Sequence, residues 1–519
     1  MRSVQASKNA GASLISQIIV LLIGFATRTA FIYTLSSTFL GISGLFQSVL
    51  VILNVSELGI GTSIIYALYK PLAENDHEKI KSLMSFYKKA YLLIGFIVLV
   101  IGLSLLPFLD HIIKEEIEVV NIRIVFVLYI IESVSSYWIC GYKRAILQAS
   151  QREYIITKYN AIVRIVAEVF RFSLLFILKN HPEYSFYTYL SVGIIYQTVV
   201  NIVISHKSNQ LFECLKEKNV VPIDKKDKKD IMKNVVGASV SKVSGVMINS
   251  IDNILISAFL GITVVGVYSN YLTLKSYLIL PLTIIFGSMA AGIGDFCAIE
   301  SLDNQKKLFK NLQFAYFWIY GFASIGFFIM CNPFIRTIWL RDDQYLLEEN
   351  TVLIISLIIM LDGLAGAVIS FRDANGLYWR TKYRYLFSAL LNFVISFVLV
   401  KYIGINGVLI GTLASVIILV LFDPIILFKY VFHEKPFKYY LSYFGFLLLI
   451  ASTGLLIWFI SRFFAEYTIT NFIIRLAFCI FIPNVLWLLI FRKDSRFINV
   501  KTKIMSLVRH ITKRSAENE

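Results

Sequence analysis

Ten ionisable side chains stand inside apolar stretches of about 20 residues, the length that crosses a membrane as a helix. They are Arg28, Glu57, Glu132, Arg164, Glu168, Arg171, Lys242, Asp252, Lys275 and Asp362. A charge at the centre of a membrane helix costs about 2.5 to 3.5 kcal/mol, so ten charges facing lipid would cost roughly 30 kcal/mol. We therefore expect these residues to face one another or a water-filled cavity, the kind of place that a polar substrate passes through.

Spacing groups three of these residues on one helix face. Arg164, Glu168 and Arg171 are separated by 4 and 3 residues, so Glu168 can pair with either arginine within its own helix. This set is either a structural ion-pair network or part of the cavity lining. Arg28 and Lys275 have no such partner in their own stretches and are stronger candidates for the cavity.

The carboxylates fit two roles. Glu57, Glu132, Asp252 and Asp362 are candidates for ion coupling, and together with Glu168 they can also pair with cations across the cavity. Lys242 lies near a cytoplasmic end, where its long side chain can reach the surface instead. The ten residues carry five positive and five negative charges, so the charge balance alone does not identify an anionic cargo.

The elements that carry these residues are predicted to be membrane-spanning helices. Of 519 residues, 57% are hydrophobic and 16% are charged, against roughly 25% charged in soluble domains. The apolar stretches fall at 11–34, 40–67, 88–109, 119–140, 157–178, 184–205, 235–258, 264–290, 312–335, 350–370, 385–400, 405–428, 439–461 and 471–491. We therefore predict an all-α polytopic membrane protein of about 14 transmembrane helices.

The basic residues between these stretches predict the orientation of the chain. If the N-terminus is cytoplasmic, the inside segments hold 37 Lys and Arg, whereas the outside loops hold only 6. Cytoplasmic loops are enriched in Lys and Arg, so both termini are expected to be cytoplasmic. The formal charge of +17 follows from this topology, and no nucleic-acid partner is expected.

A weak internal repeat suggests two parallel six-helix lobes. Lys8-Asn9 recurs as Lys233-Asn234 at an offset of 225, and the run LGIS at 40–43 recurs as LGIT at 260–263 at an offset of 220. Repeats of this kind are common in transporters. The predicted division is an N-terminal lobe at 1–205, a basic cytoplasmic linker at 206–233, a C-terminal lobe at 234–430, two extra transmembrane helices at 431–491 and a cytoplasmic tail at 492–519.

The tail has the pattern of a helix that lies on the membrane surface. Ile504, Leu507, Val508 and Ile511 follow helical spacing among Lys and Arg residues. A basic amphipathic helix of this type binds the anionic inner leaflet. We therefore expect membrane lipids to be partners of the chain.

Residues for enzymatic chemistry are absent from the predicted spans. All six histidines fall in loops or tails, and the sequence contains no Walker-type glycine loop, HExxH or GxSxG motif. The five cysteines are scattered without metal-ligand spacing. We expect no catalytic residues, no metal site and no cofactor, and we expect the chain not to be an enzyme.

Several motifs near the N-terminus resemble the polysaccharide transporter family. They are Arg28, the run LGISGLF at 40–46, ELGIG at 57–61 and YKPLAE at 69–74. This family includes bacterial O-antigen and capsule repeat-unit flippases and belongs to the multidrug/oligosaccharidyl-lipid/polysaccharide exporter superfamily. The resemblance covers the whole chain in architecture, although the specific residues concentrate in the first 90.

The resemblance implies a flippase with two lobes around a central cavity in the bacterial cytoplasmic membrane. Its substrate would be an undecaprenyl-diphosphate-linked oligosaccharide, moved from the inner to the outer leaflet by alternating access. By position, Arg28 and Lys275 match cavity arginines that related lipid II flippases carry in their first and eighth spans. The second span departs from that pattern, because it offers Glu57 and no arginine.

Chemistry then assigns the cations to the diphosphate. A sugar diphosphate needs a hydrated path with cationic donors, and arginine binds phosphate in bidentate fashion. The expected contacts are Arg28, Arg164, Arg171 and Lys275.

Other functions compete with this one. The alternatives are export of drugs or of another lipid-linked substrate, and polymerisation of a membrane glycan. The short outer loops disfavour an enzyme, but a separate glycan polymerase is a possible partner.

Overall fold

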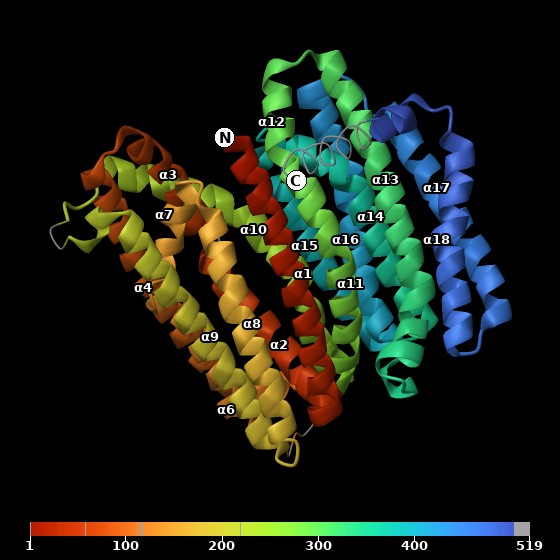
Figure 1. Ribbon diagram of the computed structural model, residues 1–519, viewed down its shortest axis with the longest axis horizontal. Coiled ribbons are helices and arrows are strands. Elements are labelled where there is room, and N and C mark those ends of the chain that lie inside the picture. Colours follow the sequence, from red (N-terminus) through yellow and green to blue (C-terminus); the bar gives the residue numbers. More distant parts are fainter. Residues whose placement is uncertain are drawn as a thin grey trace, which may run out of the picture. The chain divides into compact units, whose positions relative to one another are not determined.

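The computed structural model describes residues 2–57, 59–113, 115, 117, 119–217 and 220–502, and the regular structure in this part of the chain is helical (Figure 1). The prediction of an all-α polytopic membrane protein is confirmed. The side chain of Lys242 and the predicted tail helix with Ile504, Leu507, Val508 and Ile511 lie outside the described residues.

Two compact units divide the chain, residues 1–269 and 270–519. Unit 1 contains α1 (Arg2–Leu35), α2 (Ser37–Leu53), α3 (Ile60–Glu74), α4 (His77–Leu105), α5 (Leu109–Ile112), α6 (Ile122–Trp138), α7 (Arg144–Ala149), α8 (Glu153–Ile177), α9 (Pro182–Leu211), α10 (Lys225–Leu260) and the start of α11 (Ile262–Ser288). Unit 2 contains the rest of α11, α12 (Ala290–Ile299), α13 (Leu302–Pro333), α14 (Glu349–Ala374), α15 (Tyr378–Ile403), α16 (Ile405–Leu427), α17 (Phe437–Ser461) and α18 (Ile469–Phe491). The predicted lobe boundaries stay a prediction.

Every predicted span falls on a helix or on a pair of helices. Within the described residues, 10 helices are long and apolar enough to cross a membrane, and the pair α6 and α7, bent by 49°, makes an eleventh. The other three predicted spans differ for separate reasons. The second is broken between α2 and α3 at 54–59, and the fifth, α8, carries the three charges Arg164, Glu168 and Arg171. In the seventh, on α10, a continuous run of side chains is described from Ser250 to Leu260, and this part is a short apolar helix.

Unit 1 is a layered array of long helices. Helix α8 packs between α1 and α9, α9 packs on α6, and α6 packs on α4. Helix α10 packs against α2 and α3. Asp76 fixes the start of α4, because its carboxylate accepts a hydrogen bond from the Lys79 backbone N–H at 2.9 Å and so caps the helix.

Unit 2 is built on helical hairpins. Helix α13 packs on α14, α14 on α16, and α16 on α15, while α17 and α18 pack on α13. The very short turn expected between 385–400 and 405–428 is present at Gly404, whose φ is 58°. A Cβ atom on Gly407 would lie 2.4 Å from the Leu399 carbonyl carbon, so glycine there lets the α15 and α16 backbones touch.

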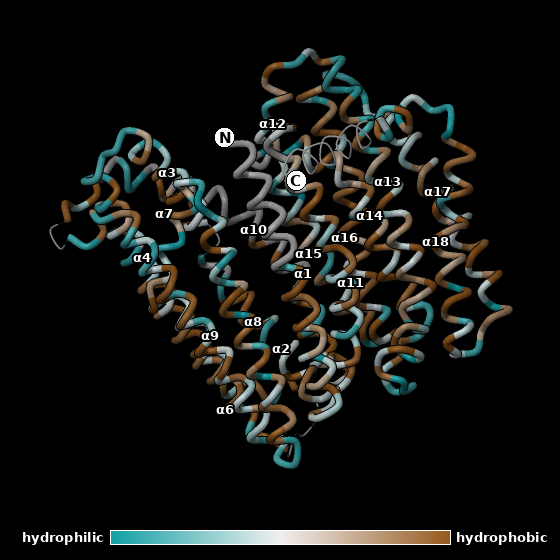
Figure 2. Tube along the Cα trace, in the orientation of Figure 1, coloured by the Kyte–Doolittle hydropathy of each residue, from teal (hydrophilic) through white to brown (hydrophobic). Residues whose placement is uncertain are grey.

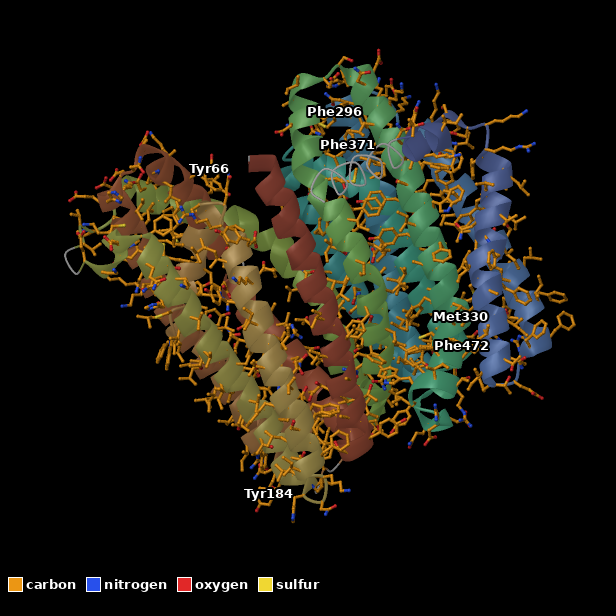
Figure 3. All side chains as sticks on the ribbon, in the orientation of Figure 1. Tyr66, Tyr184, Phe296, Met330, Phe371 and Phe472 are labelled. Atoms are coloured by element: carbon orange, nitrogen blue, oxygen red, sulfur yellow. The ribbon has the colours of Figure 1, made fainter. Side chains whose placement is uncertain are left out.

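The helices of both units are mainly hydrophobic along their lengths and more hydrophilic near their ends and in the loops (Figure 2). Leu93 and Phe96 on α4 and Leu448 and Phe459 on α17 are among the exposed large apolar residues. Exposed apolar surface on this scale marks contact with lipid. The exposed Tyr66 and Tyr184 lie at opposite ends of unit 1 (Figure 3), where amphipathic aromatic rings meet the membrane–water interfaces.

Candidate functional site

Arg28 lies in the last turns of α1 and is held by contacts within unit 1. Its Nη2 atom donates a hydrogen bond to the Ser269 hydroxyl at 2.7 Å. The neighbouring Thr27 is buried, and its hydroxyl is 3.3 Å from the Glu168 carbonyl oxygen on α8. Arg28 is only partly buried, and the hydrogen bond to Ser269 orients its guanidinium.

The charged set on α8 forms the two ion pairs that its spacing predicted. Glu168 lies 3.9 Å from Arg164 and 3.4 Å from Arg171. The Arg164 side chain is 53% exposed, whereas that of Arg171 is 16% exposed and that of Glu168 is 9% exposed. The two arginines therefore share one carboxylate but have very different access to water.

Arg171 has further partners on the neighbouring helices. Its Nε atom donates to the Tyr189 carbonyl oxygen at 3.2 Å, and its guanidinium lies 4.3 Å from the centre of the Tyr189 ring. A Cβ atom on Gly193 would be 2.5 Å from Arg171 Nη2 and 2.9 Å from Glu132 Oε1, so the two charged groups meet over this glycine. Arg171 and Glu132 are thus part of a packed network, and Arg164 is the more accessible cation of α8.

Glu57 lies in a cluster of tyrosine hydroxyls. It accepts a hydrogen bond from Tyr91, which in turn accepts one from Tyr87 at 3.0 Å. The Tyr91 ring also packs edge-on against Tyr137, with ring centres 5.5 Å apart. Sequence analysis named Glu57 as a candidate for ion coupling but missed these partners, although Tyr87 and Tyr91 are four residues apart on α4 and so share a face.

Asp252 is buried on α10, at the contact with α2. It is 6% exposed, and the next residue, Asn253, donates from Nδ2 to the Ser48 hydroxyl at 2.9 Å and to the Gly44 carbonyl oxygen at 3.3 Å. Helices α2 and α10 are therefore joined by polar contacts within unit 1.

The N-terminal ends of α2 and α11 touch through their backbones. A Cβ atom on Gly41 would lie 1.9 Å from the Ile262 carbonyl oxygen, and a Cβ atom on Gly266 would lie 1.9 Å from the Ser37 carbonyl oxygen. The Thr38 and Thr263 hydroxyls are 3.3 Å apart and separated by 225 residues. Gly41 and Gly266 share this separation, which equals one of the repeat offsets seen in the sequence.

Unit 2 contains Lys275 and Asp362. Asp362 is exposed on α14 between the buried residues Leu361 and Gly363, and Lys275 is partly buried on α11. Asp362 also lines a small cavity of about 30 Å³ together with Tyr385, Asp423 and Tyr439. The predicted convergence of Arg28 and Lys275 on one cavity involves both units and stays a prediction.

A buried ion-pair network in unit 2 was missed by sequence analysis. Asp423 on α16 lies 2.7 Å from Arg372 and 2.9 Å from Arg384, and the Asp423 and Arg372 side chains are 5% and 7% exposed. Arg372 also donates to the Tyr385 hydroxyl and to Asp373. The two arginines were counted as loop charges, and Asp423 was set aside because it is near a span end. An aspartate inside an apolar run nevertheless calls for a cationic partner, and that signal was available.

Fold and charge placement together define a polytopic helical membrane protein. A family model described as polysaccharide biosynthesis protein matches residues 6–293, more than half of the chain. The chain therefore belongs to the polysaccharide biosynthesis protein family. No curated protein sequence shows significant similarity to it.

Solved structures share the fold at low sequence identity. The lipid II flippase MurJ in an inward closed conformation is similar with a TM-score of 0.65 and 16% identity, covering 93% of this chain and 99% of MurJ. An inward-facing multidrug resistance transporter of the MATE family, in the MOP superfamily, gives a TM-score of 0.57 and 15% identity, covering 79% of this chain and 97% of that one. A point mutant of the Vibrio cholerae MATE transporter VcmN gives a TM-score of 0.55 and 12% identity, covering 82% of this chain and 98% of that one.

Proposed function

We propose that the chain is a flippase that moves an undecaprenyl-diphosphate-linked oligosaccharide from the inner to the outer leaflet of the bacterial cytoplasmic membrane, with both termini cytoplasmic. The family match to polysaccharide biosynthesis proteins carries this proposal. The likeness to a lipid II flippase supports a lipid-linked cargo. The cargo is carried across without covalent chemistry and without a cofactor.

The cations with partial access to water are the proposed diphosphate contacts. Arg28 and Lys275 are each partly buried within apolar helices, and Arg164 keeps half of its side chain exposed beside only one distant carboxylate. A half-exposed cation inside a membrane helix needs water or an anion near it. Arg171 is the fourth cation of the proposed site. It donates to the Tyr189 carbonyl oxygen and pairs with Glu168, so its proposed role is to orient Glu168 and Glu132.

The carboxylates divide in the same way. Asp362 is exposed on a buried helix and is the proposed ion-coupling group of unit 2. Glu57 and Asp252 are the corresponding candidates in unit 1, whereas Glu132 and Glu168 pair with arginine.

The test replaces single charges in a bacterium whose surface glycan depends on this chain. Arg28→Ala and Lys275→Ala should each lower surface glycan about tenfold or more at normal membrane levels, the effect of losing one charge-assisted hydrogen bond to phosphate. Arg123→Ala is the matched control, because Arg123 is an exposed arginine paired with Asp110 at 3.1 Å. Lipid-linked repeat units should accumulate on the inner leaflet.

Three results would contradict the proposal. Unchanged glycan in both variants would remove the proposed contacts. Accumulation on the outer leaflet would identify a defect in polymerisation. Raised drug sensitivity with normal glycan in a deletion strain would identify a drug exporter, the activity named for the MATE relatives.

A further inference from the structure

A cavity lined by lysines lies at one end of unit 1, away from the charged faces of α1 and α8. It has a volume of about 370 Å³ and is lined by the first turns of α4, by η3 (Gly141–Lys143) and by η4 (Glu213–Lys216). We call it the lysine cavity, and it is defined by Lys81, Lys88, Tyr142, Lys143, Cys214, Lys216 and Glu217. The positive-inside prediction puts this end of the unit on the cytoplasmic side.

The charges around this cavity are not balanced. Four lysines and one glutamate line it. Glu217 is committed to Lys81, whose Nζ atom lies 2.6 Å from Glu217 Oε2. Lys216 reaches only Glu213, at 3.5 Å with both side chains more than half exposed, and a pair of that kind contributes little.

Lys143 is the most informative member of the set. It is 8% exposed, and its Nζ atom donates to Asn209 Oδ1 at 2.8 Å, which is a neutral partner. Within the described residues neither Lys143 nor Lys88 has a carboxylate at ion-pair distance. Burying an ammonium without a counter-charge is costly, so an anion in the cavity would stabilise this arrangement.

Topology alone does not account for this arrangement. Lysines that keep a loop on the cytoplasmic side work equally well when exposed, as Lys89 is. Three separate elements instead bring lysines to one cavity, and one of these lysines is buried. The volume of the lysine cavity, about 370 Å³, is just above the lower limit of small-molecule pockets, about 300 Å³. It is many times the space of one water molecule, about 30 Å³.

We propose that the lysine cavity binds a phosphate-bearing ligand, either the head group of an anionic membrane lipid or a soluble phosphorylated compound. Ammonium groups bind phosphate as point charges, and the Tyr142 hydroxyl adds a donor at the same wall. This site is separate from the proposed substrate path, because none of its residues is among the charges assigned to transport.

The probe is inorganic pyrophosphate, and the readout is Cys214, which lines the cavity and is buried. Burial raises the pKa of the Cys214 thiol, so alkylation is run at alkaline pH on the full chain in neutral detergent and followed peptide by peptide. Pyrophosphate should slow alkylation of Cys214 but not of Cys297, which lies in unit 2. The proposal would be overturned if Cys214 were alkylated at the same rate with and without pyrophosphate, both in detergent and in nanodiscs of phosphatidylglycerol or phosphatidylcholine.

Variants separate a site from a general charge effect. Lys88 and Lys216 are both exposed, so the double variant Lys88→Gln with Lys216→Gln should fold. It should raise the pyrophosphate concentration that half-protects Cys214 about tenfold or more, as expected for losing charge-assisted hydrogen bonds. Lys143→Gln should do the same. Lys89→Gln, next to Lys88 but outside the cavity, should leave protection intact, and equal losses in this control would refute the proposal. Arg28→Ala should also retain protection, so failure of the transport hypothesis and failure of this one are distinguishable.

Lipid nanodiscs identify the source of the phosphate. Protection of Cys214 in phosphatidylglycerol but not in phosphatidylcholine, without pyrophosphate, supports a lipid head group. Protection in both lipids only after pyrophosphate is added supports a soluble ligand.

Discussion

Adding one methyl group to Gly41 or Gly266 tests the backbone contact between α2 and α11. The added Cβ atom would lie 1.9 Å from a carbonyl oxygen in each case, and ordinary contact begins at 3.4 Å, so the helices must separate by about 1.5 Å. Overpacking of this kind costs about 1 to 3 kcal/mol. We expect Gly41→Ala and Gly266→Ala each to lower the free energy of unfolding by that amount.

The double variant distinguishes this contact from two independent sites. One separation of α2 from α11 relieves both clashes, so Gly41→Ala with Gly266→Ala should cost about as much as either change alone. Neighbouring residues that share a contact show interaction energies of roughly 0.5 to 3 kcal/mol, whereas independent sites add. The measurement is unfolding of the purified chain in mixed micelles titrated with SDS.

Two glycines serve as controls. Gly445 has open space around its Cβ position, and Gly44 would make only ordinary contacts. Alanine at either position should be neutral, or stabilising by up to about 1 kcal/mol through helix propensity. Additive losses in the double variant, or single variants as stable as these controls, would refute the backbone contact.

Four further outcomes are expected. Asp423→Asn should lower the free energy of unfolding by about 3 to 5 kcal/mol, because it removes the carboxylate that lies between Arg372 and Arg384 and leaves Arg372 with Asp373 as its acidic neighbour; SDS titration checks this, and a loss below about 1 kcal/mol contradicts it. Arg171→Ala should reduce the amount of folded protein, whereas Arg164→Ala should reduce surface glycan at normal protein levels; blots of membranes and of glycan compare the two. Glu168→Gln should destabilise the chain by about 1 to 3 kcal/mol, and Glu153→Gln, at the start of the same helix, should not. The Arg496 side chain lowers the pKa of Asp494. The pair therefore contributes its full stabilisation above the ordinary aspartate pKa of about 4, and this contribution is lost as the pH falls through the lowered pKa of Asp494. Asp494→Asn should make the free energy of unfolding less dependent on pH in that acid range only.

The helices could be predicted because apolar runs of membrane length leave few alternatives. Two exceptions have local causes. The second span breaks at 54–59, next to Glu57, whose carboxylate is held by Tyr91. Helix α8 carries the three charges Arg164, Glu168 and Arg171, and it is not among the helices that are apolar enough to cross a membrane by composition. Spacing within this one helix was nevertheless enough to predict both of its ion pairs.

Contacts between distant helices were beyond the reach of periodicity. Arg372 and Arg384 have the composition of a cytoplasmic loop, and only the packing of α14 and α15 on α16 brings them to Asp423. Gly41 was visible as a member of a repeated stretch, but a spacing rule cannot show that its backbone touches that of Gly266. The missing information is which helix faces which, and single-helix patterns do not contain it.

Exposure separates the intramembrane charges more sharply than their type does. Arg171 and Arg164 are each one helical turn from Glu168. Tyr189 and Gly193 enclose Arg171, whereas the Arg164 side chain stays half exposed. A group whose donors are all engaged can release none for a passing phosphate without leaving a buried charge uncompensated, a loss of several kcal/mol. A half-exposed arginine exchanges water for phosphate at little cost. We therefore expect transport to use the more exposed cations, and we expect the enclosed ones to hold the helices that carry them.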